Sequence, residues 1–489
     1  MKRLTISFLQ FLFICFTICL GHEYLFAVNV KDFGAKGDGK TDDTGAINAA
    51  ISGASDGLVE FPRGTYLIKK TIEIDLSRYG SIGLSGRGAS AGIIMAGEGP
   101  AFRFIGSHDK GSALPSSVKQ LTWEKERMPL IDALEIIGDH ENADGIELRN
   151  TFMPTLRALL IRNVRNGIHL SSRNRNVLID ACHVYNNSGI GIFLDQVNIH
   201  QFIISDSHIS YCKKGGIKVI GSEIRNFQIT GNDIEYNCDP EGPVSADILV
   251  DCSQSGSVRE GTISGNTIQA IPSPGGANIR FLGLNGNSDK IGLWSITGNH
   301  ISNQEVNIHL ENTRGISISG NTFIRGYNRH LLINNGRNLI INGNVFDHNE
   351  DYFPSEPAAY GGILLSHGEN VILSDNIIDG SGNGNKELGG AIVVLDSHEI
   401  NISACHIKNP IFNGIQVDRS INLQISNCII SESAKNNGML SAISLKGVCT
   451  GTLVRDNSVG MGKLAEISNN AEGAIVKKNI SIRAFNNLK

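Results

Sequence analysis

The sequence has little proline, few aromatic residues and almost no net charge. Proline supplies 12 of the 489 residues against 56 glycines, which argues for many tight turns and excludes collagen or a proline-rich linker. The 43 Lys and Arg are balanced by 48 Asp and Glu, so the basic excess of a nucleic-acid-binding protein is missing and we expect no nucleic-acid partner. Hydrophobic residues at 40% are too many for a disordered chain and too few for a membrane bundle.

Cysteine is present without a pattern that indicates disulfides or metal. Nine cysteines occur, none of them in a Cys-x-x-Cys pair, so a zinc site has no support. Seven remain once the first 27 residues are set aside, and an odd number at irregular spacing is not a disulfide framework. Cys182, Cys405 and Cys428 share one position of the repeat described below, which predicts small apolar residues stacked in a core.

The chain begins with the features of an export signal. Lys2 and Arg3 precede an uncharged apolar run from Phe8 to Leu20, and Leu25-Phe26-Ala27 offers a cleavage site. The run is shorter than the roughly 18 residues that a membrane span needs. We therefore expect residues 1–27 to be a signal peptide. The mature protein would be periplasmic, at the cell surface or secreted, without stable insertion in a membrane.

A short pattern, Ile-x-Gly-Asn-x-Ile, recurs along the chain and defines the architecture. Clear copies begin at Ile229, Ile263 and Ile296. Asn, or Ser or Cys in variants, holds a marker position at residues 182, 207, 232, 266, 299, 321, 344, 376, 405, 428 and 457. Neighbouring markers are 22 to 34 residues apart, which indicates one structural coil per repeat with loops inserted at tolerant corners.

Within each coil, apolar and polar residues alternate with the period of two that is typical of β-strands. A second strand, Gly-Ile-x-Leu or close to it, follows the marker, as at residues 167–170, 191–194, 216–219 and 414–417. These features predict an all-β protein, a right-handed parallel β-helix of about 12 to 14 coils in which identical positions stack about 4.8 Å apart. Stacked marker Asn residues would hydrogen-bond along the turn, and Gly would supply the tight bends.

The segment before the repeats predicts a cover for the open end of this solenoid. The Gly-Asp-Gly-Lys-Thr-Asp-Asp run at residues 37–43 lacks the spacing of a cation loop and the context of a phosphate loop. We interpret it as a turn in which Thr41 or Asp42 caps a helix over residues 43–52. That helix would plug the first coil, since bare strand edges invite aggregation.

This segment also carries a family resemblance. Val30 to Thr44, followed by the apolar run at residues 46–51 and by Val59 to Tyr66, resembles the N-terminal signature of the pectate-lyase-like superfamily. Rhamnogalacturonase- and epimerase-type proteins and some phage tailspikes share that signature. The resemblance implies one β-helix domain, with residues 28–75 as cap and first coils and residues 76–489 as the remaining coils.

One stretch of the sequence can be compared with the catalytic motif of a particular hydrolase family. Asn142-Ala143-Asp144-Gly145-Ile146-Glu147 resembles the Asn-Thr-Asp-Gly-Ile-Asp motif of polygalacturonases, whose first Asp is catalytic. That family has paired Asp residues in the following coil, where this chain has Arg165-Asn166, and Gly-His-Gly where this chain has Asn187-Ser188-Gly189. Polygalacturonase chemistry with the usual residues is therefore not expected, and we predict that Asp144 is a turn residue.

The x position of each Gly-Ile-x-Leu strand points away from the core. Aligning the coils gives one outward column: Glu147, His169, Phe193, Lys218, Leu249, Arg280, His309, Leu332, Leu364, Val393, Gln416 and Ser444. A second column lies two residues further on: Arg149, Ser171, Asp195, Ile220, Asp251, Leu282, Glu311, Asn334, Ser366, Leu395, Asp418 and Lys446. Ionisable residues gather between 147 and 311, and inserts at 238–245, 270–277 and 347–360 would wall this face as a groove.

Cations in a groove suit an anionic polysaccharide such as a uronan. In β-elimination a base removes the proton beside a carboxyl group whose charge has been neutralised, and a Lys of lowered pKa can serve. We assign Lys218 as the base. Arg280 and His309 would neutralise the carboxylate or protonate the leaving oxygen.

The carboxylates of the second column support a different reaction. Asp251 and Glu311 lie two coils apart, about 9.6 Å by strand spacing, which approaches the roughly 6.5–9.5 Å carboxyl separation of inverting hydrolases. They could instead hold Ca²⁺, so no cofactor is certain and Ca²⁺ stays open. Candidate substrate-binding residues in and beside the groove are Glu147, His169, Asp195, Tyr236, Tyr352 and Tyr360.

The sequence thus predicts an exported enzyme that degrades an acidic, pectin-like polysaccharide by β-elimination. A glycoside hydrolase of the same fold is the first alternative. A non-catalytic glycan-binding surface protein is the second.

Overall fold

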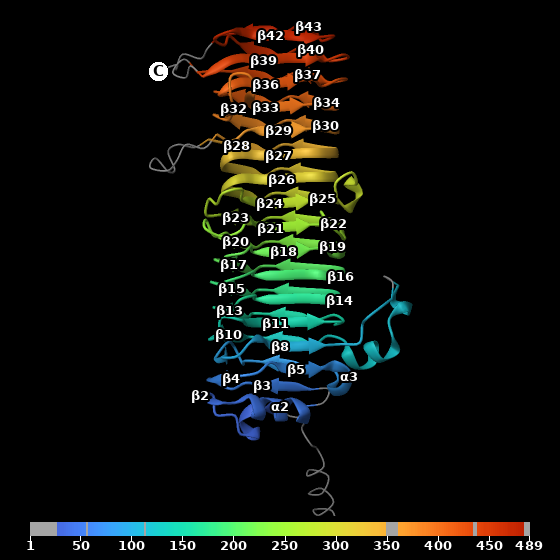
Figure 1. The fold of residues 1–489 in the computed structure, drawn as a ribbon, viewed down its shortest axis with the longest axis vertical. Coiled ribbons are helices and arrows are strands. Elements are labelled where there is room, and N and C mark those ends of the chain that lie inside the picture. The colour runs from blue at the N-terminus through green and yellow to red at the C-terminus, as the bar shows by residue number, and fades with distance from the viewer. Residues whose placement is uncertain (1–26, 55–56, 112–113, 349–359, 434–437, 484–489) are drawn as a thin grey trace, which may run out of the picture.

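The computed structural model describes residues 27–54, 57–111, 114–348, 360–433 and 438–483 of the chain. Their strands wind into one long solenoid whose coils follow each other from the N-terminal to the C-terminal end (Figure 1). Nearly all neighbouring strands are parallel, each pairing with the equivalent strand of the coil before and the coil after. The predicted all-β, right-handed parallel β-helix is confirmed.

Each complete coil contributes to three parallel sheets, named A, B and C here. Sheet A contains β5 (Ile72–Asp75), β8 (Gly99–Ile105), β11 (Ala143–Arg149), β18 (Ile217–Ile220), β21 (Ala246–Asp251), β24 (Ala277–Leu282), β29 (Ile363–Ser366), β32 (Asn383–Gly384), β33 (Gly389–Leu395), β36 (Phe412–Asp418), β39 (Met439–Val448) and β42 (Ala465–Glu472). Only β32 runs antiparallel in that sheet, among the described strands, where it pairs with β33.

Sheet B follows sheet A around the coil. It contains β1 (Val28–Asn29), β3 (Leu58–Glu60), β6 (Gly83–Ser85), β9 (Leu130–Asp132), β12 (Thr155–Arg157), β19 (Glu223–Thr230), β22 (Ser257–Ser264), β25 (Ile291–Thr297), β30 (Glu369–Ser374), β34 (His398–Ser403), β37 (Gln424–Ser426), β40 (Leu453–Arg455) and β43 (Ile475–Lys477).

Sheet C closes the coil before the chain enters sheet A again. It contains β2 (Asp38–Asp42), β4 (Gly64–Ile68), β7 (Ala91–Met95), β10 (Leu134–Gly138), β13 (Leu160–Arg162), β15 (His183–Tyr185), β17 (His208–Ser210), β20 (Asp233–Glu235), β23 (Thr267–Gln269), β28 (Val345–Asp347), β31 (Ile377–Asp379), β35 (His406–Lys408), β38 (Ile429–Ser431), β41 (Ser458–Gly460) and β44 (Ile480–Ile482). Long strands bend through the corners: β14 (Ile168–Asp180) and β16 (Ile192–Ser205) serve sheets A and B, and β26 (His300–Ser319) and β27 (Thr322–Asn342) serve all three.

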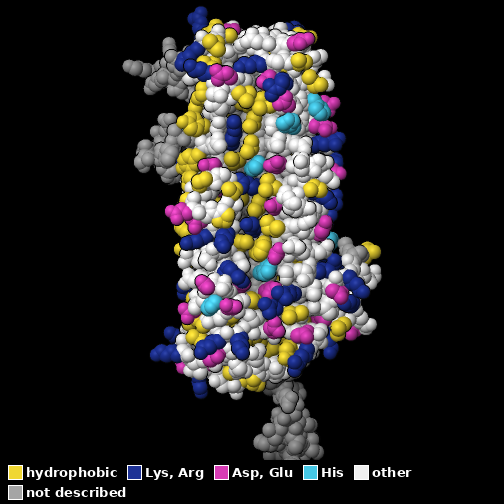
Figure 2. All heavy atoms as spheres, viewed as in Figure 1, with side chains coloured by type: hydrophobic (Ala, Val, Ile, Leu, Met, Phe, Trp, Pro, Cys, Tyr) yellow, Lys and Arg dark blue, Asp and Glu magenta, His cyan; other side chains and the backbone are white. Residues whose placement is uncertain are grey.

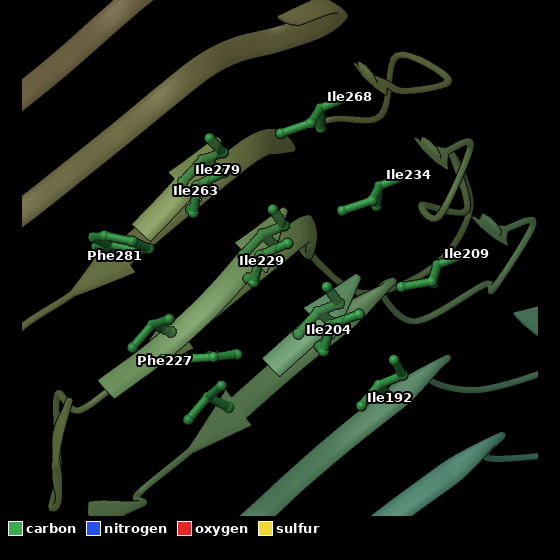
Figure 3. Packing of buried hydrophobic residues seen from close by; sticks show 14 of the residues in the cluster. Ile192, Ile204, Ile209, Phe227, Ile229, Ile234, Ile263, Ile268, Ile279 and Phe281 are labelled. Atoms are coloured by element: carbon green, nitrogen blue, oxygen red, sulfur yellow. The ribbon is translucent and has the colours of Figure 1, made fainter. Parts of the chain in front are cut away.

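The alternation of apolar and polar residues explains the core. Equivalent Ile residues of successive coils stack on one another, as Ile204, Ile229 and Ile263 do in sheet B, and Figure 3 shows these ladders meeting inside the solenoid. Each of these side chains is fully buried, and burying one stabilises the fold by about 1.5–3 kcal/mol. Cys182, Cys405 and Cys428 are also buried in this core as free thiols, as predicted.

The Gly-Asn pair of the repeat forms the turn between sheets B and C. Gly298 adopts φ +64°, a left-handed conformation that suits Gly. The side chain of the following Asn299 then lies buried inside the turn. Its Oδ1 accepts hydrogen bonds from the backbone N and the Nδ2 of Asn266 at 3.0 and 2.9 Å, and its Nδ2 donates to Asn321 Oδ1 at 2.9 Å. The predicted Asn ladder is confirmed.

The N-terminal end is covered as the sequence predicted. Helix α2 (Thr44–Gly53) lies across the first coil (Figure 1) and buries Ile47, Ala50 and Ile51 against the core. The capping detail differs from the prediction, because the N-cap is Asp43, whose carboxylate accepts from the backbone N atoms of Lys36 and Gly37 instead.

The remaining helices are short. They are η1 (Val30–Phe33), α3 (Leu76–Tyr79), η2 (Pro115–Ser117), the π-turn η3 (Thr122–Glu126) and η4 (Ser288–Lys290). The loop that carries η2 and η3 leaves the coil between β8 and β9 and projects from the side of the solenoid (Figure 1). No helix of the described residues is long and apolar enough to span a membrane.

Candidate functional site

Sheet A places both outward columns in the register that the sequence predicted. Strand pairing puts Glu147, His169, Phe193, Lys218, Leu249, Arg280, His309 and Leu332 opposite one another in successive coils. The second column is likewise continuous from Arg149 to Glu311. The inserts before β21 and β24 fall at the corner between sheets C and A, beside these columns.

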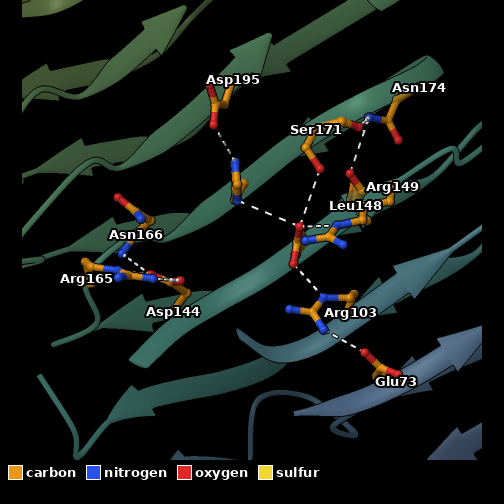
Figure 4. Close-up of polar contacts among 12 residues, drawn as sticks. Glu73, Arg103, Asp144, Leu148, Arg149, Arg165, Asn166, Ser171, Asn174 and Asp195 are labelled. Atoms are coloured by element: carbon orange, nitrogen blue, oxygen red, sulfur yellow. Dashed lines mark hydrogen bonds and ion pairs between the residues drawn. The ribbon is translucent and has the colours of Figure 1, made fainter. Parts of the chain in front are cut away.

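A network of alternating charge fills the N-terminal part of the first column (Figure 4). Arg103 donates its Nε–H to Glu147 Oε2 at 2.6 Å and its Nη1–H to Glu73 Oε1 at 2.6 Å, and Arg149 also contacts Glu147. Burial alone would raise the pKa of Glu147, but the hydrogen bonds from Arg103 and Arg149 outweigh it and lower the pKa. Glu147 is only 3% exposed, so its predicted contact with substrate is wrong for this conformation.

Asp144 is not the turn residue that the sequence suggested. It lies on β11, is 5% exposed and accepts hydrogen bonds from Arg165 Nε at 3.0 Å and Arg165 Nη2 at 2.6 Å. The backbone N of Asn166 donates to the same carboxylate at 2.9 Å (Figure 4). Arg165 therefore neutralises Asp144 in a structural ion pair, and the backbone of Asn166 adds a hydrogen bond.

His169 and Asp195 lie on neighbouring coils. His169 Nε2 is 3.7 Å from Asp195 Oδ2, and its imidazole ring stacks on Phe193 with 5.2 Å between the ring centroids. Both side chains are partly exposed on sheet A. Their role in binding substrate stays a prediction, and Phe193 adds an apolar ring beside them.

Lys218 is a partly buried cation without a partner. No hydrogen bond or ion pair joins its ammonium group to another residue in the described part of the chain. Burial lowers the pKa of Lys218 and the charge of Lys214 lowers it further, while Asp251 opposes both effects. A desolvated lysine is a stronger candidate for a base than a solvated one, because more of it is neutral near neutral pH.

Arg280, His309 and Glu311 form a chain of contacts on the next coils. Arg280 donates its Nε–H to His309 Nδ1 at 3.2 Å and contacts the carbonyl oxygens of Gly275 and Ser245 in the wall. Burial, together with the charge of Arg280, lowers the pKa of His309 to about 4. The ring is therefore neutral, with its proton on Nε2, 3.7 Å from Glu311 Oε2.

This arrangement limits what His309 can do. It stands three coils from Lys218, about 14 Å along sheet A, which is too far for both to act on one glycosidic bond. Its predicted role as proton donor to the leaving oxygen is therefore not supported. His309 orients Arg280 instead.

Asp251 and Glu311 lie two coils apart, with Leu282 between them. Asp251 accepts a hydrogen bond from the backbone N of Ser253 at 2.9 Å, and Glu311 is 39% exposed. One Ca²⁺ ion, with ligands at about 2.3–2.6 Å, cannot join carboxylates this far apart without rearrangement. Among the described residues no group of three or more His, Cys, Asp or Glu is arranged to hold a metal.

Apolar residues form the floor between these charges. Leu249 separates Lys218 from Arg280, and packs in a small outward cluster with Ala246, Ala277 and Val306. Figure 2 shows hydrophobic side chains running along this face, with Lys, Arg and His among them. Such a surface suits a ring with an apolar face and charged substituents.

The tyrosines predicted to bind substrate lie in different surroundings. Tyr236 follows β20, at the corner between sheets C and A, and its hydroxyl accepts a hydrogen bond from Gln269 Nε2 at 2.9 Å. Tyr360 is 50% exposed, and its backbone N bonds to the carbonyl oxygen of Tyr327. Tyr352 lies outside the described residues.

Sequence reasoning missed a buried polar ladder beneath the groove. Four consecutive coils replace the Gly of Gly-Ile-x-Leu with Asp247, Asn278, Asn307 and His330. Asp247 Oδ2 accepts from Asn278 Nδ2 at 3.1 Å, and His330 Nδ1 lies 2.7 Å from Asn307 Oδ1. Burial raises the pKa of Asp247 to about 8 although hydrogen bonds oppose it, and burial lowers the pKa of His330 to about 3. The replacement of Gly at this position of the repeat was the sequence signal that could have revealed the buried ladder.

Comparisons with known proteins agree with the fold. Residues 27–238 match the family model "Rhamnogalacturonase A/epimerase, pectate lyase-like", and residues 246–388 match "Right handed beta helix region". Both matches agree with a right-handed parallel β-helix, and the first is a similarity to pectate-lyase-like proteins over the N-terminal part of the chain, as the resemblance implied.

Relatives of this chain differ in their named activities. Uncharacterized protein YclG from Bacillus subtilis is 23% identical over 453 residues, which cover 86% of this chain and 65% of YclG. A probable glucan endo-1,3-β-glucosidase from Arthroderma benhamiae is 50% identical over 64 residues, covering 11% and 7%. Alginate lyase 7 from Azotobacter vinelandii is 36% identical over 121 residues, covering 24% and 13%. The chain spans less than two thirds of each of these relatives.

The similarity to solved structures is low. The N-terminal fragment of bacteriophage Phi29 gene product 12 superposes with a TM-score of 0.46 at 16% identity, covering 91% of this chain and 73% of that one.

Proposed function

We propose that the protein is an exported lyase that cleaves an acidic, uronate-containing polysaccharide lying along sheet A. The observation that carries this proposal is Lys218, a partly buried and unpaired lysine of lowered pKa on an apolar floor. The short similarity to an alginate lyase supports the same class of reaction.

The reaction follows from the order of groups in the column. Neutral Lys218 takes the proton from the carbon beside the uronate carboxyl group, the electron pair forms a carbon–carbon double bond, and the adjacent carbon–oxygen bond breaks. The leaving oxygen takes a proton from solvent. Arg280, two coils away, is only 7% exposed and is held by His309 and Gly275. It would act through its positive charge, without direct contact, to stabilise the negative charge that builds up on the carboxylate.

The test uses the purified protein with polygalacturonate, alginate and neutral glucans, each with Ca²⁺ or with a chelator. Ultraviolet absorbance of unsaturated ends and total reducing ends are followed together. We expect both to rise with an acidic polymer. Lys218→Met should lower the rate by about 10²–10⁴-fold, whereas Lys408→Met on sheet C should leave it unchanged.

Other outcomes would assign the protein differently. Reducing ends without unsaturated ends would contradict the lyase proposal and indicate a hydrolase. Binding of acidic polymers without any product, in all of these conditions, would indicate a glycan-binding surface protein.

A hydrolase is the second candidate, because Asp251 and Glu311 project from one column two coils apart. Their strands are about 9.6 Å apart, which leaves room between the two carboxyl groups for the attacking water of an inverting hydrolase. In that case Asp251→Asn and Glu311→Gln would each abolish the release of reducing ends, while Lys218→Met would chiefly weaken binding of the acidic polymer.

A further inference from the structure

Sheet C carries a second surface, and of its residues only Tyr236 was predicted to contact the substrate of sheet A. Its two outward columns run through β15, β17, β20, β23 and β26, and their side chains are aromatic, amide, hydroxyl, imidazole and carboxylate groups. The labels of β15, β17, β20 and β23 lie along one edge of the solenoid in Figure 1.

Three tyrosines of successive coils form a row at one end of this surface. The ring centroids of Tyr185 and Tyr211 are 5.3 Å apart, and those of Tyr211 and Tyr236 are also 5.3 Å apart. Tyr185 is 46% exposed and Tyr211 42% exposed. Exposing a run of aromatic rings has a solvation cost, and such patches mark binding sites. The rings advance by one coil, a step close to the length of one pyranose unit in an extended glycan.

A groove continues from this row. It has a volume of about 430 Å³ and is lined in part by Gln269, His300, Ser302, Asn303 and Asp347. Gln269 links the two parts, because its Nε2 donates to the hydroxyl of Tyr236 at 2.9 Å. The tyrosine row and the groove therefore form one continuous track.

Asn303 lines this groove and carries an unpaired polar atom. Its side chain is 8% exposed, and its Oδ1 has no hydrogen-bond partner among the described residues. Leaving a buried acceptor unpaired is unfavourable. Because this oxygen is itself covered in the present conformation, the Asn303 side chain would have to turn toward the groove for a sugar hydroxyl to donate to it.

The charge of the track selects the kind of sugar. Asp233 and Glu235 stand beside the tyrosine row, their carboxyl groups interact, and Asp347 lies in the groove. His208 Nδ1 is 3.3 Å from Asp233 Oδ2, and burial lowers the pKa of His300. Carboxylates on the track would repel a uronate chain, in contrast to the cations of sheet A.

We propose that this track of sheet C binds a neutral glycan chain, with sugar rings stacked on Tyr185, Tyr211 and Tyr236 and the next units held in the groove by Gln269 and Asn303. The site is separate from the sheet A groove and does not depend on the reaction there. The protein would thus hold an uncharged polymer on one face and act on an acidic polymer on another.

The test measures binding of neutral and acidic hexasaccharides to the purified protein by calorimetry. The probes are cello-, laminari-, manno- and xylohexaose, with hexagalacturonate for comparison. We expect at least one neutral probe to bind. Tyr185→Ala with Tyr211→Asn should then weaken it at least tenfold, whereas Tyr185→Phe, which keeps the ring, should stay within about threefold. Asn replaces Tyr211 because φ there is +58°.

Asn303→Gly separates binding from a structural role. Gly accepts the φ of +60° at this position, and the change removes an acceptor that has no partner. Binding should weaken several-fold while the melting temperature stays equal or rises. A fall in melting temperature without loss of affinity would overturn the role of Asn303.

Two further results would overturn the proposal as a whole. One is the absence of binding by every neutral probe, and the other is unchanged affinity in the folded double tyrosine variant. Lys218→Met should leave neutral-probe affinity as it is, so failure of the sheet A reaction and failure of this track are distinguishable.

Discussion

In the proposed reaction, Lys218 takes its reactivity from its position in the first column of sheet A. Leu249 and Ile220 surround it with apolar surface, and the charges that reach it are Asp251 and Lys214, with opposite effects on its pKa. Removing either neighbour should therefore move the pH dependence of the reaction in a direction that can be stated beforehand.

Lys214→Gln removes a like charge, so the pKa of Lys218 should rise and the rising limb of the pH–rate profile should move to higher pH. Asp251→Asn removes an opposite charge and should move that limb to lower pH. Initial rates of unsaturated-end formation between pH 6 and 11 measure both shifts. A shift of the same sign in both variants would contradict the assignment of Lys218 as base.

Asp247 links the buried ladder to stability. Its pKa is about 8 in the folded chain against an ordinary value of 3.8, so the folded state holds the proton more tightly and stability falls as pH rises between these values. The buried histidines oppose this decline slightly near pH 6.5, where an unfolded imidazole is still half protonated, and contribute nothing above about pH 7.5, where they are neutral in both states.

We therefore expect the melting temperature to decline from pH 6.5 to 8.5. Asp247→Asn, which cannot ionise, should flatten that decline. Differential scanning calorimetry of both proteins across this range gives the measurement, and equal slopes would show that Asp247 does not titrate there.

At the scale of the element, the Gly-Asn turn repeats one set of hydrogen bonds from coil to coil. Asn299 accepts from Asn266 below and donates to Asn321 above and to the carbonyl oxygen of Ile263 at 3.0 Å. Asn299→Ala leaves these buried partners unsatisfied, at a cost of about 2–4 kcal/mol. Chemical denaturation measures the loss.

Asn470→Ala provides the matched control for this prediction. Asn470 is exposed on β42, and its side-chain contact with Ser468 at 3.3 Å is open to water. We expect a change below about 0.5 kcal/mol. A similar loss in both variants would mean that the ladder adds no specific stability.

The elements also show how far the sequence leads. The repeat pattern predicted the coils, the Asn ladder and the register of both sheet A columns, because each depends on local periodicity. The N-terminal segment predicted a helix over residues 43–52, which the structure places at Thr44–Gly53. It did not predict that Glu147 and Asp144 are buried, because their partners Arg103 and Arg165 come from other coils. The tyrosine row could have been predicted from the sequence, because the intervals between Tyr185, Tyr211 and Tyr236 are 26 and 25 residues, close to the coil period.

At the scale of the whole molecule, the open end of the solenoid depends on helix α2. Ile47 and Ile51 are at most 1% exposed where they cover the first coil. Ile47→Asp with Ile51→Asp should lift the helix and expose strand edges, so the protein should associate. Light scattering after size-exclusion chromatography detects this, and Ser52→Asp on the exposed face of the same helix should stay in the wild-type state.

Each coil advances the chain by the same distance along the solenoid, so the coils set fixed spacings between groups on one face. The distance between any two groups on a face is a whole number of coils, so deleting one coil, such as residues 300–321, would shorten that distance by about 4.8 Å while each remaining coil keeps its own chemistry. On the proposed glycan-binding faces, gain or loss of whole coils would therefore change the length of glycan that a face binds, while the contacts within each remaining coil stay the same.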